Sequence, residues 1–84
     1  MKATNSALYG CNCVIVEPGD DPVRVVNFAT EIGAEYTDLE GESQIVAQFP
    51  GQEPAPYTSA ELFRHVKRLG EAHAAEMAVV TTES

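Results

Sequence analysis

Residues 7–17 read Ala-Leu-Tyr-Gly-Cys-Asn-Cys-Val-Ile-Val-Glu, and the fold is inferred outward from them. In an extended strand, Leu8, Val14 and Val16 lie on one face, while Cys13 and Ile15 lie on the other. A strand that is apolar on both faces is typical of the interior of a sheet that is covered on both sides. We therefore expect this stretch to form a central strand.

A helix and a hairpin are predicted to follow the central strand. Asp21 is a suitable N-cap, Pro22 suits the first helical position, and the apolar spacing continues to Ile32, where Gly33 ends the helix. Residues 35–39 and 43–49 are expected to be the arms of a hairpin that turns at 40–42. This prediction places Leu39 on the inner face of the first arm.

The second half of the chain has one strong helix signal. Thr58 and Glu61 form a capping box, and the apolar face of the predicted helix continues to about His73. Residues 76–82 are predicted to form a last strand, and the Pro-rich residues 50–56 are predicted to be a loop. Residues 1–6 and 83–84 are expected to fray.

These elements follow the order β-α-β-β-α-β in a single domain, residues 1–84. The order predicts an α+β, ferredoxin-like two-layer sandwich: an antiparallel four-stranded sheet, ordered 4-1-3-2, with two helices on one face. Another small α+β arrangement with different strand pairing is the alternative. The second face of such a sheet carries apolar side chains and no helix, which indicates a partner protein or a second copy of the chain.

Composition limits the possible partners. The chain has 84 residues, with 13 acidic against 5 basic side chains and a net charge of −8. Phosphates repel such a protein, which argues against direct binding to nucleic acid or to an anionic membrane. The longest apolar run is Cys13 to Val16, too short to span a bilayer, and no secretory signal is recognised, so we expect a cytoplasmic protein.

No catalytic residue, cofactor or metal site is predicted. Cys11 and Cys13 are too close in sequence for the usual zinc patterns and lie on one side of a strand, which favours two buried thiols. His65 is predicted to be a surface residue, and His73 is predicted to lie at the end of its helix. We expect a protein that is not an enzyme. The alternative is a small enzyme that uses Cys11 or His73.

The charged residues form two clusters. The predicted partner-binding residues are an aromatic anchor, Tyr36, and five carboxylates within twelve positions that contain no Lys or Arg: Glu31, Glu35, Asp38, Glu40 and Glu42. These carboxylates would steer the chain onto a basic protein surface, although a plain solvated surface is the alternative. A basic cluster on one helix face is interpreted as solvated, and the alternative is a contact with a small anion or with nucleic acid: Arg64, Lys67 and Arg68.

A small, strongly acidic α+β chain of this kind resembles the phage-encoded anti-CRISPR proteins, in particular an inhibitor of a type I-E system. The resemblance covers length, charge and the pattern of elements, and no sequence motif carries it. It implies an inhibitor that binds a subunit of the RNA-guided surveillance complex in the host bacterial cytosol. The alternative is a homodimeric ferredoxin-like regulatory or ligand-binding module. The chain alone leaves the partner, the blocked step and the choice between monomer and homodimer open.

Overall fold

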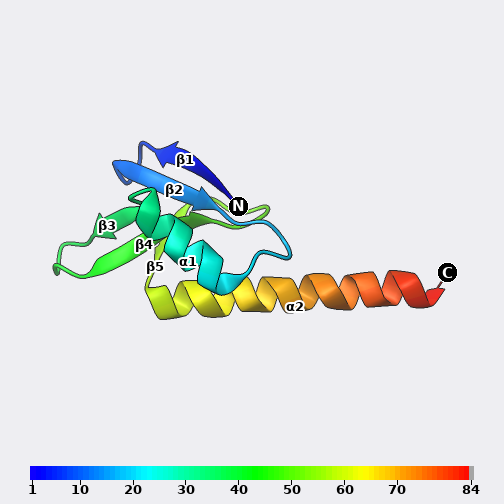
Figure 1. Ribbon diagram of the computed structural model, residues 1–84. Coiled ribbons are helices and arrows are strands. Elements are labelled where there is room, and N and C mark those ends of the chain that lie inside the picture. The colour runs from blue at the N-terminus through cyan, green and yellow to red at the C-terminus, as the bar shows by residue number, and fades with distance from the viewer. Residues whose placement is uncertain (84) are drawn as a thin grey trace.

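The computed structural model describes the backbone of residues 1–83 and the side chains of residues 1–76 (Figure 1). The five strands form one mixed sheet that is accompanied by two helices, so the chain is a small α+β protein, as predicted. In chain order the elements are β1 (Lys2–Ser6), β2 (Cys11–Ile15), α1 (Pro22–Glu31), β3 (Glu35–Thr37), β4 (Ser43–Gln48), β5 (Ala55–Tyr57) and α2 (Ser59–Glu83).

β2 lies inside the sheet, as the apolar character of both its faces predicted. It pairs antiparallel with β1 and parallel with β4, and β4 also pairs antiparallel with β3 and β5. The predicted hairpin, whose arms are now β3 and β4, is confirmed. The ferredoxin-like topology is not confirmed, and its antiparallel four-stranded sheet is wrong, because the sheet has five strands and the β2–β4 pair is parallel.

Both ends of the chain differ from the prediction. Residues 2–6 were expected to fray, but they pair with β2 along their whole length as β1, and β1 takes the place predicted for the C-terminal strand. The predicted strand at 76–82 belongs to α2, which continues to Glu83. No Gly or Pro interrupts residues 71–83, so nothing in the sequence stops the helix. Ser84, expected to fray, lies outside the described residues.

The predicted helix starts are confirmed by their hydrogen bonds. The side chain of Asp21 accepts from the Val23 N–H at 3.2 Å, and Pro22 begins α1. The Glu61 N–H donates to Thr58 Oγ1 at 3.2 Å, and the Thr58 hydroxyl lies 3.3 Å from the Glu61 carboxylate. Ile32 is the C-cap of α1, and Gly33 follows it. Gly33 has a φ of 72°, which glycine adopts without strain.

One apolar core joins both helices to one face of the sheet. Fully buried side chains from β2, α1 and α2 meet alternate residues of β4. Burial of each Val or Leu among them stabilises the fold by about 1.5–3 kcal/mol. Beyond this core, the C-terminal half of α2 extends past the sheet (Figure 1), which gives the molecule extents of 50 × 21 × 19 Å. The main contributors to the core are Val14, Val16, Val25, Ala29, Ile45, Ala47, Phe49, Leu62 and Val66.

The other face of the sheet is less open than predicted. Cys13 and Val46 alternate with the core residues along their strands, so they face away from the helices. Both are nonetheless fully buried, and Ile15 on the same face is half-buried. The expected uncovered apolar patch is therefore largely closed within the single chain. Among the described residues, no helix has both the length and the apolar character needed to cross a bilayer.

Candidate functional site

Two turns meet at one end of the molecule, which we call the hairpin end: residues 7–10 before β2 and residues 38–42 before β4. Because β2 and β4 are parallel, the turns that precede them lie at the same end of the sheet. A tyrosine pair joins them: the ring centroids of Tyr9 and Tyr36 lie 5.2 Å apart in an edge-to-face arrangement. Residues 27 positions apart in the chain therefore form one surface.

Asp38 fixes the shape of the second turn. The backbone N–H groups of Glu40 and Glu42 both donate to Asp38 Oδ1 at 2.9 Å, and the Asp38 N–H donates to the Glu42 carbonyl oxygen at 3.0 Å. Gly41 has a φ of 85°, which the turn requires and which other residues adopt only with strain. The half-buried Asp38 carboxylate thus holds the turn, and Glu40 and Glu42 remain exposed to solvent.

Apolar side chains project from both turns. Leu39 is fully exposed and Leu8 is 83% exposed. The prediction that Leu39 lies on the inner face of a strand is wrong, because β3 ends at Thr37 and Leu39 falls in the turn. A hollow of about 270 Å³ lies at this turn and is lined by Tyr36, Asp38, Leu39 and Glu40. Two exposed leucines therefore flank a tyrosine pair at the hairpin end.

The predicted carboxylates gather around this surface. Asp38, Glu40 and Glu42 belong to the turn itself, while the exposed Glu35 begins β3, which leads to it. The exposed Glu31 closes α1, and that helix end lies beside the start of β2, because Asn12 Nδ2 donates to the Ile32 carbonyl oxygen at 2.6 Å. Three of the six predicted partner-binding residues thus belong to the hairpin end, and Glu31, Glu35 and Tyr36 border it.

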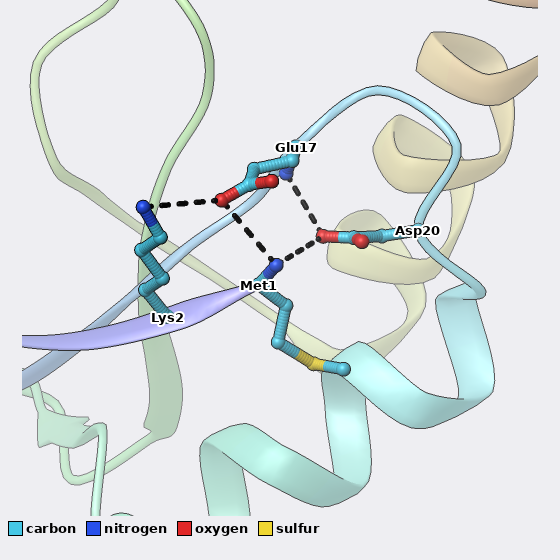
Figure 2. Close-up of polar contacts among 4 residues, drawn as sticks. All are labelled: Met1, Lys2, Glu17 and Asp20. Atoms are coloured by element: carbon cyan, nitrogen blue, oxygen red, sulfur yellow. Dashed lines mark hydrogen bonds and ion pairs between the residues drawn. The ribbon is translucent and has the colours of Figure 1, made fainter.

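The ion pairs between residues 1–76 join Met1 and Lys2 to Glu17 and Asp20, which follow the end of β2 at Ile15 (Figure 2). The amino group of Met1 is 3.1 Å from Asp20 Oδ2 and 3.7 Å from Glu17 Oε1, and Lys2 Nζ is 3.9 Å from Glu17 Oε1. The Glu17 N–H also donates to Asp20 Oδ2 at 2.9 Å. None of these pairs includes a carboxylate of the hairpin end, so its negative charge is not compensated by a neighbouring cation there.

The cysteines form no disulfide, and their surroundings disfavour the thiolate. Cys13 is fully buried and Cys11 is half-buried. Burial raises the pKa of both thiols, and the neighbouring Cys11 raises the pKa of Cys13 further. A thiol with a raised pKa is a poor nucleophile at neutral pH, because the thiolate is the reactive form.

The histidines are far from the hairpin end. His65 is exposed on α2, as predicted, with its ring edge-on to Tyr57 at 5.2 Å and to Phe49 at 5.8 Å. The prediction that His73 ends its helix is wrong, because α2 continues for ten more residues, from Ala74 to Glu83. Among the described residues, no three His, Cys, Asp or Glu side chains are grouped as a metal ion would require.

Sequence reasoning missed Leu8, Tyr9 and Leu39 as parts of the site. It assigned them to strands, where an apolar residue signals a core. The available signal was the position of each beside a glycine turn: Leu8 and Tyr9 directly precede Gly10, and Leu39 lies two residues before Gly41. Turns run over the surface of a protein, so an apolar residue within a turn is expected to be exposed rather than to belong to the core.

Comparison of the chain with protein-family models, with curated proteins and with solved structures found no match.

Proposed function

We propose that the protein is a non-enzymatic binding protein whose hairpin end contacts a basic surface of another protein. The observation that carries the proposal is the combination at one end of two exposed leucines, a tyrosine pair and five carboxylates outside any ion pair between residues 1–76. Protein interfaces typically have an apolar, aromatic centre and a polar rim. The hairpin end has this composition, with a rim of one charge sign.

The two parts of this surface have different effects on binding. Burial of Leu8 and Leu39 under a partner would each stabilise a complex by about 1.5–3 kcal/mol, because both are free to lose their exposed surface. The carboxylates at the rim act mainly on the association rate and on the choice of partner, through long-range attraction to Lys and Arg. Binding is therefore expected to weaken with salt without disappearing.

The specific partner that we propose is a subunit of a type I-E CRISPR surveillance complex, and its location is the host bacterial cytosol. The support is the resemblance to phage-encoded anti-CRISPR proteins together with the acidic hairpin end. A protein surface that holds nucleic acid is basic, and an acidic protein is attracted to it without binding nucleic acid itself. Occupying that surface would block target DNA entry or nuclease recruitment.

Two observations favour this proposal over the other hypotheses. A homodimer through the second sheet face would need exposed apolar side chains there, but Cys13 and Val46 are already buried in the single chain. An enzyme that used Cys11 would need a reactive thiolate, whereas burial raises the pKa of that thiol. The hairpin end requires neither a second copy nor a reactive group.

A charge-reversal pair tests the proposal. The double variant Glu40→Lys/Glu42→Lys leaves Asp38 in place, so the two backbone hydrogen bonds that hold the turn persist. We expect it to bind the type I-E surveillance complex at least about tenfold more weakly than the native chain, in biolayer interferometry at about 50 mM salt.

The matched control is Glu53→Lys/Glu71→Lys, because both residues are exposed and lie outside the hairpin end. Either double variant makes two reversals of two charges each, from −8 to −4. Equal weakening by the two variants would show that only net charge matters and would refute a specific site at the hairpin end. Failure of the native chain to bind the complex would refute the proposed partner.

A further inference from the structure

A groove runs between α1 and the first turns of α2. Its volume is about 540 Å³. Among residues 1–76, four large apolar side chains are exposed: two belong to the hairpin end, and the other two, Val23 at 53% and Phe63 at 38%, line this groove. The groove is lined by Val23, Val26 and Asn27 from α1 and by Ser59, Ala60, Phe63 and Arg64 from α2.

The rim of the groove is basic, in contrast to the rest of the chain. Arg64 lines the groove, Lys67 follows the lining residue Phe63 by one helical turn, and Arg24 precedes the lining residue Asn27 by three positions on α1. All three basic side chains are exposed, and none of the ion pairs between residues 1–76 includes them. Three of the five basic residues therefore lie in or next to the groove without a carboxylate partner among residues 1–76.

The shape and charge of the groove define its occupant. A furrow between two packed helices accepts the ridge of a third helix, whereas an extended strand would find no sheet edge there for its backbone groups. A second copy of the same surface would bring like charges together, which disfavours self-association. We propose that the groove binds an amphipathic helix of another protein, with apolar residues at i, i+3/i+4 and i+7 and with Asp or Glu beside them.

This second site shares no residue with the hairpin end. The chain would then hold two partners, or two parts of one partner, of opposite character: a basic surface at the hairpin end and an acidic helix at the groove. The groove proposal does not depend on the function proposed above, because neither Glu40 nor Glu42 lines the groove. Loss of binding in Glu40→Lys/Glu42→Lys therefore tests the hairpin end alone.

A peptide library displayed on phage and selected on the immobilised full chain tests the proposal. We expect the recovered 16-residue peptides to be enriched in apolar residues at helical spacing and in Asp and Glu. A fluorescein-labelled peptide from this set should bind Phe63→Ser and Arg64→Glu at least tenfold more weakly, measured by anisotropy. It should bind Arg68→Glu with unchanged affinity, because Arg68 makes the same charge change on the same helix but does not line the groove.

Circular dichroism of each variant identifies any loss of folding, and Arg64→Glu, an exposed helix position, keeps the test valid if Phe63→Ser unfolds. The proposal is overturned if the recovered peptides are basic or lack helical spacing, or if Phe63→Ser and Arg64→Glu leave binding unchanged. It is also overturned if sedimentation shows a dimer of the native chain that Phe63→Ser or Arg64→Glu dissociates, since the groove would then belong to a second copy.

Discussion

At the scale of the residue, Asp38 controls the geometry of the hairpin end. Its carboxylate serves structure, because it accepts two backbone N–H groups, while the neighbouring Glu40 and Glu42 are exposed to solvent. The sequence grouped all three as equivalent contact residues. The structure separates one residue that shapes the surface from two that charge it.

We expect Asp38→Ala to destabilise the protein by about 1–2 kcal/mol, because the Glu40 and Glu42 N–H groups lose their acceptor. Asp38→Asn keeps an oxygen at the same position and should recover most of this stability. Urea unfolding followed by circular dichroism measures both variants. Equal loss in the two variants would indicate that the charge of Asp38, rather than its hydrogen bonds, holds the turn.

Tyr57 gives a pH dependence at the same scale. Burial raises its pKa above the ordinary value of 10.0, and the charges of Tyr9 and Glu61 raise it further. The folded state therefore retains the phenol proton at a pH at which the unfolded chain loses it. Its contribution to the free energy of unfolding is complete below about pH 10 and is lost as the pH rises through the folded pKa.

The Tyr57→Phe variant removes this titration, and the aromatic contact with Phe49 can persist. We expect the free energy of unfolding to fall less between about pH 9 and about pH 11 in the variant than in the native chain. Urea titrations at the two pH values measure the difference. An equal fall in the free energy of unfolding of the two proteins between these pH values would show that Tyr57 does not contribute to alkaline destabilisation.

At the scale of the element, local signals located the helix starts and the central strand. The caps at Asp21 and Thr58 act through neighbouring backbone groups, so a short stretch of sequence contains the whole interaction. The apolar side chains on both faces of β2 likewise indicated a strand in the interior of the sheet. The grouping of the acidic residues could also be predicted, because they are close in sequence and their turn joins adjacent strands.

The Thr58 capping box makes a prediction at this scale. We expect Thr58→Ala to lower the free energy of unfolding by about 1 kcal/mol, because the Glu61 N–H loses its acceptor at the first turn of α2. Thr58→Ser keeps the hydroxyl and should cost only a few tenths of this value. A thermal melt of the three proteins orders them, and an alanine variant as stable as the native chain would contradict the role of the cap.

Elements that depend on distant partners were missed. The residues of β1 lack apolar alternation, and four of its five side chains are exposed, so its strand conformation comes from pairing with β2. The Val-Val-Thr-Thr run at 79–82 has β propensity, but it continues a helix that no residue after Gly70 interrupts. Leu8 and Leu39 were misplaced for a related reason, because only the strand ends show that they lie in turns.

At the scale of the whole molecule, charge is distributed unevenly. Five carboxylates outside any ion pair between residues 1–76 lie in or beside the hairpin end, and no Lys or Arg interrupts residues 31–42, while four of the five basic residues belong to α1 and α2. A net charge of −8 therefore describes a polar arrangement rather than a uniform surface. The molecule is expected to orient before it docks, with the hairpin end toward a basic partner.

Hydrogen–deuterium exchange of the chain, free and bound to the type I-E surveillance complex, is the sharpest test of binding through the hairpin end, because it maps the contact without any substitution. We expect slower exchange on binding at residues 7–10 and 38–42 and unchanged exchange at the residues of β1 that lie far from these turns. Protection confined to other segments, with both turns exchanging as in the free chain, would contradict it.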